Sequence, residues 1–359
     1  MTVEQETLFK LLRIALGNEC DYSLPLSLDW KAIIDMSFEQ GVAALAVDGL
    51  QKIYDANPNL NLDLDKPELE DLKYEWFGEV MNVEQDFAIQ WTAACNLAEL
   101  FKDAGIKTYV LKGFSIAKYY PIPEHRSCCD FDCFLANDAD SAFELSNQLL
   151  EKRGFEIDKK HYKHYSFVYN GLHVENHRFC TGIRGKKWLK EFEGYLQGVL
   201  ASSDKCLDGS CIIEPPTLFN SLFFIQHAHN HFLHEGITLR HLCDWAVLMD
   251  RIGDDVIEFE KVCQKYGLKI FKDSLTRLVR RWLCGEDIAL EKQDMRLLDD
   301  IYLKRPALDS GNGFAFRRQL VKNELSSAWK YHYFSARPML VELAQQTWGY
   351  LFDKNPEID

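Results

Sequence analysis

The chain contains the stretch Ser127-Cys-Cys-Asp-Phe-Asp-Cys-Phe-Leu135, in which apolar and acidic residues alternate. Because alternate side chains of a strand share one face, this pattern predicts a strand over Cys128–Leu135. Asp130 and Asp132 would project together from one face, where two carboxylates repel each other unless a cation lies between them. Carboxylate oxygens favour Mg²⁺ or Mn²⁺ over zinc. The other face would be apolar and suited to burial, with Cys129, Phe131, Cys133 and Leu135.

A predicted β-hairpin follows this strand. Asn170-Gly171 separates two alternating runs, Tyr165–Tyr169 and Leu172–Phe179. This dipeptide favours a two-residue turn, because both turn positions need a positive φ. An isolated Asp-x-Asp is common in an acidic chain, so the residues that this hairpin adds decide how the acidic pair is interpreted.

The register of the hairpin predicts which of its side chains share a face. A two-residue turn pairs Ser166 with Glu175 and His164 with His177. His173, Glu175 and His177 then point the same way, since they are two residues apart. Glu175 would be a third acid for the same cation. His173 and His177, which flank Glu175, would contact it and hold it in position, although solvent-exposed histidines are commoner on strands.

A strand-to-helix turn lies upstream of the acidic pair. The sequence predicts a strand at Lys107–Leu111 and a short helix at Phe114–Tyr120, which Pro121 and Pro123 end. Backbone N–H groups at the start of a helix bind phosphate, and Gly113 would let a ligand approach closely. The turn Leu111-Lys-Gly-Phe-Ser115 is therefore a candidate phosphate-binding loop.

The spacing of apolar residues predicts an α+β fold flanked by helices. Apolar residues recur at three- and four-residue steps in the first hundred residues and again after Glu214, as in amphipathic helices. Between them the period is two, apart from a predicted helix at Ala139–Arg153. We expect a small mixed or antiparallel sheet within three parts: a helical region at 1–104, an α+β core at 105–213 and a helical domain at 214–359. A loop is predicted at Asp309–Gly313.

Composition and charge narrow the classes of partner. The 359 residues include 41 Lys and Arg against 55 Asp and Glu, a net charge of −14. A protein that binds nucleic acid over its whole surface carries an excess of positive charge, so a small molecule or a protein is the better candidate partner. The sequence contains no uninterrupted run of 18 apolar residues, so we expect no membrane-spanning segment and no membrane partner. Eleven scattered cysteines without a Cys-x-x-Cys pair predict a reduced, cytoplasmic protein.

Several short motifs occur in a consistent order over about residues 105–250. They are Leu111-Lys-Gly113, Tyr120-Pro-Ile-Pro-Glu-His-Arg126, Asp130-Phe-Asp132, Glu175-Asn-His177 and Gly236-Ile-Thr-Leu-Arg-His-Leu-Cys-Asp244. In these motifs the chain resembles a group of uncharacterised bacterial nucleotidyltransferases, within the superfamily that shares the polymerase-β palm. Each motif is modest alone, and together they are more specific for the fold than for the activity.

The resemblance implies transfer of an NMP from an NTP to an unknown acceptor, with release of pyrophosphate. Asp130, Asp132 and Glu175 would hold two Mg²⁺ (or Mn²⁺) ions, which stabilise an in-line displacement. Glu175 would also activate the acceptor hydroxyl. The phosphates would be positioned by Lys112, Gly113, Ser115 and Arg126. Supporting roles would fall to His177, Arg240 and Asp244.

One departure from the resemblance leaves the activity open. Better-known members carry Gly-Ser in the phosphate loop, whereas Lys-Gly-Phe-Ser stands here. A catalytically degenerate binding or regulatory protein is therefore an alternative to the enzyme. Structural roles are also open: Lys112 as a solvated strand-end residue, Arg126 in a salt bridge to Asp130 or Asp132, and Arg240 paired with Asp244 four residues along a helix.

A histidine-rich helix suggests a third function. His227, His231 and His234 fall at i, i+4 and i+7 and would share one helix face, as in a hydrolase that binds zinc or iron. The His-Glu-x-x-His pattern of such enzymes is absent from the sequence. Packing histidines are therefore the favoured interpretation, with a His-metal hydrolase as the alternative.

Overall fold

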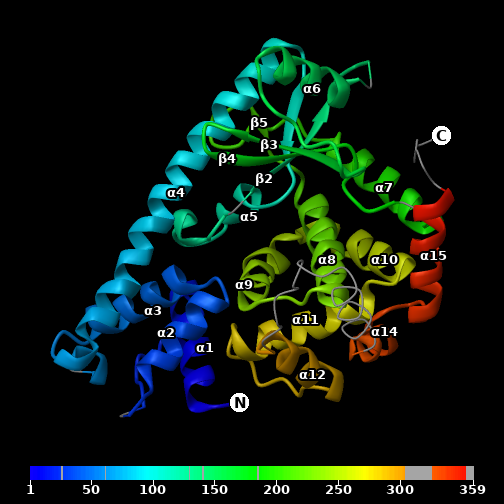
Figure 1. The fold of residues 1–359 in the computed structure, drawn as a ribbon. Helices are drawn as coiled ribbons and strands as arrows, with labels where there is room; N and C mark the ends of the chain where they lie inside the picture. The colour runs from blue at the N-terminus through cyan, green and yellow to red at the C-terminus, as the bar shows by residue number, and fades with distance from the viewer. Residues whose placement is uncertain are drawn as a thin grey trace, which may run out of the picture.

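In the part of the chain that the structure describes, a five-stranded sheet lies between an N-terminal and a C-terminal group of helices along the sequence (Figure 1). The structure is a computed structural model and describes residues 1–25, 27–60, 62–128, 130–139, 141–183, 186–303 and 326–352. The predicted α+β class is confirmed. Cys129 and the predicted loop Asp309–Gly313 lie outside the described residues.

The elements follow in an order that places the sheet between helices. Four helices come first: α1 (Val3–Leu16), α2 (Trp30–Glu39), α3 (Ala43–Ala56) and α4 (Glu70–Asp103). The middle part contains β1 (Lys107–Val110), α5 (Phe114–Ala117), β2 (Asp130–Ala136), α6 (Ala142–Lys152), β3 (His164–Tyr169), β4 (Leu172–His177), α7 (Lys187–Leu200) and β5 (Ile212–Ile213). Then come α8 (Thr217–His234), α9 (Leu239–Leu248), α10 (Val256–Tyr266), α11 (Lys269–Trp282), α12 (Lys292–Ile301), α14 (Ala328–Phe334) and α15 (Met339–Phe352).

The sheet has the strand order β3-β4-β2-β1-β5. Its central strand β2 runs antiparallel to β1 and parallel to β4, and β5 runs parallel to β1. The sheet is therefore mixed, as predicted. The strand β5 was not expected from the sequence, because two residues are too short to show an alternating pattern.

The hairpin of β3 and β4 has the predicted register. Asn170 and Gly171 adopt φ angles of 49° and 83°, and Tyr169 pairs with Leu172 across the turn. Ser166 therefore lies opposite Glu175, and His164 lies opposite His177. This agreement has a local cause, since a two-residue turn with positive φ at both positions allows one pairing of the flanking strands.

Two helix boundaries differ from the expected ones. The helix α5 ends at Ala117 rather than Tyr120, and it is a single turn. The helix α6 begins at Ala142, because Oδ1 of Asn137 accepts from the backbone N–H groups of Ala139 and Ser141 and holds a turn before the helix. No helix among the described residues is long and apolar enough to cross a membrane.

The long helix α4 joins the N-terminal helices to the sheet (Figure 1). Its 34 residues span roughly 50 Å at 1.5 Å per residue. Near its start, Trp76 is buried with the N-terminal helices, whereas Leu97 and Phe101 near its end pack with Phe131 and Val174 of the sheet. The helix therefore contributes to two separate hydrophobic cores.

The first and last groups of helices share one of these cores. Phe9 of α1 stacks on Trp282 of α11 with ring centroids 5.5 Å apart, and Nδ2 of Asn18 donates to the carbonyl of Leu283 at 2.9 Å. Gln40 donates to the carbonyl of Ile301 at 3.1 Å. The three predicted parts therefore describe the order along the chain, while the helices of the first and last parts pack against each other.

Helices α1 and α3 approach so closely that a glycine is required between them. A Cβ atom at Gly49 would lie 2.0 Å from the carbonyl oxygen of Leu11. We expect Gly49→Ala to lower the free energy of unfolding by about 1–3 kcal/mol, because the backbones must separate. Urea denaturation would measure this loss. The matched change Gly78→Ala in α4 meets no atom within 4 Å and should stabilise by about 0.5–1 kcal/mol. Equal effects at the two positions would contradict the packing argument.

Candidate active site

Three acids lie on one face of two neighbouring strands. In the parallel pair of β2 and β4, Asp130 aligns with His173 and Asp132 aligns with Glu175. Aligned residues of paired strands point to the same side of a sheet, so the predicted common face for the three acids is confirmed. The alternate residues Phe131 and Cys133 are buried in the core on the opposite face.

Asp132 is the buried centre of this group. Its carboxylate is 2 % exposed, with Oδ2 at 3.0 Å from Nζ of Lys112 and Oδ1 at 2.9 Å from Nε2 of His177. Burial opposes its ionisation, but the bond from His177 and the charge of Lys112 hold the pKa of Asp132 far below its usual value. Asp132 is therefore a permanent negative charge. Oδ2 also accepts no hydrogen bond, although the ammonium of Lys112 is close.

Glu175 joins two histidines to Asp132. Its Oε2 atom lies 3.2 Å from Nε2 of His177 and 3.4 Å from Nδ1 of His164. Burial opposes its ionisation, whereas the bond from His177 lowers the pKa of Glu175 below its usual value. Burial and the neighbouring His177 lower the pKa of His164 to about 4. Among the described residues, His164, Glu175 and His177 form a group whose ligand atoms all lie within 4.8 Å of one another.

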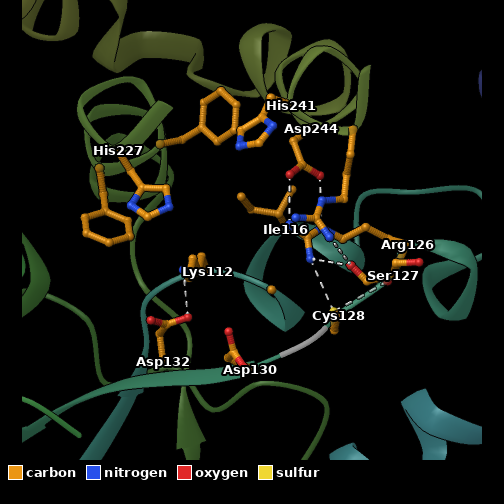
Figure 2. Close-up of a pocket in the computed structure, with 14 residues that line it drawn as sticks. Lys112, Ile116, Arg126, Ser127, Cys128, Asp130, Asp132, His227, His241 and Asp244 are labelled. Atoms are coloured by element: carbon orange, nitrogen blue, oxygen red, sulfur yellow. Dashed lines mark hydrogen bonds and ion pairs between the residues drawn. The ribbon is translucent and has the colours of Figure 1, made fainter. Parts of the chain in front are cut away.

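Asp130 has a more open environment than Asp132. Its side chain is 42 % exposed, and Oδ1 lies 3.1 Å from Nδ1 of His173. Figure 2 shows Asp130 and Asp132 along β2, with Lys112 above Asp132. The two acids of the Asp-x-Asp motif therefore differ, since one is held by buried partners and the other is free to meet a ligand from solvent.

Lys112 and Gly113 line a cavity of about 80 Å³ beside the acids. The backbone N–H of Leu111 donates to the carbonyl of Asp132 at 2.9 Å and fixes the loop against β2. Gly113 has a φ of +66°, which a residue with a side chain rarely adopts. The following helix α5 has only four residues, so its N-terminus adds little to phosphate binding. Phosphate binding at this loop would depend mainly on Lys112.

Ser115 does not fit its predicted role in phosphate binding. Its side chain is fully buried, and the hydroxyl donates to Oδ1 of Asn220 in α8 at 3.3 Å. Ser115 is also absent from the residues that line the cavity. Ser115 is the second residue of the one-turn helix α5, and its side chain points into the protein interior. Ser115 therefore serves the contact between α5 and α8.

Arg126 also has a different partner from the expected ones. Its guanidinium donates to both oxygens of Asp244 at 2.9 and 2.8 Å (Figure 2). Tyr120 donates to the same carboxylate at 2.7 Å. Arg126 and Asp244 are 8 % and 3 % exposed. Burial opposes the charge of both, but their pairing raises the pKa of Arg126 well above its usual value and lowers the pKa of Asp244. The predicted phosphate contact and the predicted bridge to Asp130 or Asp132 are both replaced by this pair.

Arg240 is left as a cation that faces the cavity. The predicted pair of Arg240 with Asp244 is replaced, because Asp244 turns toward Arg126. Within the described residues Arg240 forms no ion pair, and its guanidinium donates to the carbonyl of Ser127 at 3.3 Å. It lines the same cavity as Lys112. Arg126 lines this cavity as well, but its guanidinium is paired with Asp244.

A comparison with protein families identifies the family of the chain. Residues 27–284 match a family described as uncharacterised nucleotidyltransferase, which covers more than half of the chain. The chain belongs to this family. No curated protein and no solved structure matches it. The match includes the N-terminal helices α2 to α4, so this nucleotidyltransferase family extends beyond the sheet and its motifs.

The histidines of α8 do not form a metal site in this nucleotidyltransferase. His231 pairs with Oε2 of Glu235 at 2.7 Å, and Nδ1 of His234 lies 3.5 Å from the hydroxyl of Tyr331. His227 is half-buried and reaches toward the cavity near Lys112 (Figure 2). The rings of His227 and His231 lie 4.3 Å apart, but these histidines are not among the groups of described residues that could hold a metal ion, so the structure gives the alternative of a His-metal hydrolase no support.

A second cavity of about 310 Å³ lies on the far side of His227. His164, Lys163 and Lys186 are among the residues that line it. Lys186 is engaged with Glu342 at 2.6 Å, while burial lowers the pKa of Lys163. His164 contacts Glu175, so one residue of the second cavity reaches the acids. His227 lines both cavities, while Asp130 and Asp132 line only the first.

Proposed function

We propose that the protein is a Mg²⁺- or Mn²⁺-dependent enzyme that transfers an NMP from an NTP to an acceptor. The observation that carries this proposal is the alignment of Asp132 with Glu175 on parallel strands, next to the more open Asp130. The buried Oδ2 atom of Asp132 accepts no hydrogen bond and has the ammonium of Lys112 at 3.0 Å, so a positive charge suits its surroundings. The three carboxylates would hold the metal, which supplies charge neutralisation and orients the displaced oxygens.

The side chains around the acids have distinct proposed tasks. Lys112 balances the charge of Asp132 at 3.0 Å, and a bound cation would release its ammonium for the NTP phosphates. Arg240 adds a second positive charge in the same cavity. Arg126 acts indirectly: held by Asp244, it donates to the carbonyl of Ser127 at 3.3 Å and positions the segment before β2.

In the proposed reaction an acceptor oxygen forms a bond to the α-phosphorus of the NTP. The bond from that phosphorus to the bridging oxygen breaks, and pyrophosphate leaves. Glu175, which is ionised, would accept the proton of the acceptor hydroxyl. We propose that the acceptor enters through the second cavity, beside Lys163 and His164. The net charge of −14 favours a small molecule or a protein over a nucleic acid.

A binding or regulatory protein without activity is the second candidate. It is favoured by the loss of two predicted phosphate contacts, since Ser115 bonds Asn220 and Arg126 bonds Asp244. For either candidate we propose a cytoplasmic location. Ten free thiols within the described residues are consistent with that location.

A thermal-shift panel tests the proposed site. We expect an NTP at about 100 times its Kd, with Mg²⁺ or Mn²⁺, to stabilise the protein by about 2.7 kcal/mol and to raise the melting temperature accordingly. The double variant Asp130→Asn/Asp132→Asn should lose this metal-dependent rise. Asp138→Asn, on the exposed loop after β2, serves as the matched control and should keep it.

The outcomes of the panel separate the two candidates. A metal-dependent rise with one or more of the four NTPs, lost in the double variant, supports the site. A rise that survives in the double variant would show that the acids do not bind the metal. No rise in the wild-type protein would favour the binding or regulatory protein over the enzyme.

A further inference from the structure

The acids share their site with two imidazoles that the proposed carboxylate site does not use. His177 lies with Nε2 at 2.9 Å from Oδ1 of Asp132 and at 3.2 Å from Oε2 of Glu175. His164, opposite His177 in the hairpin, points Nδ1 at the same Oε2 atom at 3.4 Å. The ligand atoms of His164, Glu175 and His177 therefore lie within 4.8 Å of one another, and Asp132 adjoins this group through its contact with His177.

The spacing of these atoms suits a single metal ion. Zinc binds histidine nitrogen and carboxylate oxygen at about 2.0–2.2 Å, so neighbouring ligands of a tetrahedral site lie about 3.4 Å apart. The separations of 3.2 and 3.4 Å from Glu175 to the two histidines are close to this value. Small movements of these three side chains would bring their ligand atoms to one ion, and Oδ1 of Asp132, at 2.9 Å from Nε2 of His177, lies next to them.

His177 is oriented as a metal ligand would be. Its Nδ1 atom lies 3.2 Å from the carbonyl oxygen of Phe179, to which it donates, and Nε2 therefore faces the carboxylates. A backbone carbonyl behind the ring is a common arrangement for histidines that bind metals. The carbonyl itself is held in place, since Glu193 of α7 accepts from the next two backbone N–H groups, of Cys180 and Thr181, at 2.8 and 2.7 Å.

Two buried atoms in this group have no hydrogen bond. Nδ1 of His164 makes none, and neither does Oδ2 of Asp132. Each has a charged neighbour without hydrogen-bond geometry, since Oε2 of Glu175 lies 3.4 Å from Nδ1 of His164 and Nζ of Lys112 lies 3.0 Å from Oδ2 of Asp132. Buried polar atoms are usually hydrogen-bonded, so a metal ion in contact with these atoms would complete their interactions.

We propose that His164, His177, Glu175 and Asp132 form a mixed nitrogen and oxygen metal site that selects a divalent transition metal, such as Zn²⁺ or Mn²⁺, over Mg²⁺. This inference rests on the proposed function for the role of the metal in transfer, but not for its binding. Imidazole suits transition metals, whereas Mg²⁺ prefers six oxygen ligands. Asp130, paired with His173 and more exposed, remains for a Mg²⁺ ion that arrives with the nucleotide.

Metal titration of the full chain, stripped with a chelator and without nucleotide, tests the inference. We expect one Co²⁺ per chain with the visible absorption of a site with nitrogen ligands, and displacement by Zn²⁺ but not by equimolar Mg²⁺. His164→Ala should weaken Co²⁺ and Zn²⁺ binding by at least about 10–100-fold, since even residues behind a ligand have effects of this size.

A matched variant and a folding measurement make the result decisive. His173→Ala removes an imidazole from the same strand face, but one that contacts Asp130, so its Co²⁺ affinity should stay within a few-fold of wild type. His164→Asn is a second, smaller change in case His164→Ala lowers stability, and circular dichroism of the metal-free proteins checks folding. Equal binding of Mg²⁺ and Zn²⁺, or unchanged Co²⁺ binding in both folded His164 variants, would overturn the inference.

The same samples separate this inference from the proposed function. Binding of Co²⁺ through His164 without any NTP-induced thermal shift would support the metal site and contradict the enzyme. An NTP-induced shift that depends on Asp130 and Mg²⁺, with Co²⁺ binding independent of His164, would contradict the mixed site and leave the enzyme supported.

Discussion

Replacing Asp244 with Ala is expected to lower the free energy of unfolding by about 3–5 kcal/mol. The change leaves the guanidinium of Arg126 charged and only 8 % exposed, and it removes the acceptor for the hydroxyl of Tyr120. An unpaired buried charge costs far more than the pair contributes, because its hydration is not replaced. Urea denaturation at neutral pH, followed by circular dichroism, would measure the loss.

A double variant shows whether the unpaired charge is the cause. In Arg126→Met/Asp244→Leu no charge remains to be buried, so most of the lost stability should return. Asp35→Ala, which breaks an exposed pair with Lys31, should change stability by no more than about 1 kcal/mol. If the double variant is as unstable as Asp244→Ala, the loss comes from packing and not from an uncompensated charge.

The pH dependence of stability, compared between wild type and Asp244→Asn, gives an independent check that the ionised form of Asp244 stabilises the fold. The folded-state pKa of Asp244 is lowered, with burial opposing and Arg126 favouring the charge. Its contribution is therefore fully present above the unfolded-state pKa of about 3.9 and is lost as the pH falls toward the lower folded value. The stability difference between wild type and Asp244→Asn should accordingly shrink below about pH 4.

The sequence predicts well those features that depend on interactions between residues close together along the chain. The Asn170-Gly171 turn allows one strand pairing, so the positions of His164, Glu175 and His177 follow from the sequence. The alternation around Asp130 and Asp132 likewise predicts which side chains enter the core. In both cases neighbouring residues alone determine the geometry.

Contacts between distant segments were beyond such reasoning. Arg126 and Asp244 are 118 positions apart, and the i,i+4 spacing of Arg240 with Asp244 suggested a pair that tertiary packing replaces. The burial of Ser115 depends on Asn220 in α8, which no local pattern reveals. A carboxyl or guanidinium has several possible partners, and the fold decides among them.

The sequence contains part of the information that places His164 and His177 beside the acids. The hairpin register already places His164 opposite His177, and both beside Glu175. The parallel pairing of β2 with β4 then brings Asp132 to the same point, and that pairing follows from the sheet order rather than from any local signal. The donor set that we propose therefore contains imidazoles as well as carboxylates.

If the protein transfers nucleotides as proposed, Asp132→Asn should reduce turnover by at least roughly 10³-fold. Asparagine has almost the same shape, but it removes the charge that Lys112 and His177 surround. A metal held by this residue supplies several kcal/mol of transition-state stabilisation, which corresponds to a factor of this size. Pyrophosphate released from each NTP, with Mg²⁺ or Mn²⁺ and an acceptor that supports turnover in the wild type, would measure the effect.

Asp138→Asn is the matched control, because it removes one charge from an exposed position shortly after the same strand. It should leave turnover within about twofold of wild type, as surface changes away from such a site have small effects. A folded Asp132→Asn protein that keeps a tenth or more of the wild-type rate would show that Asp132 does not hold the metal. Because Lys112 and His177 would then face a neutral amide in an active enzyme, their contacts with Asp132 would have to serve the fold rather than the chemistry.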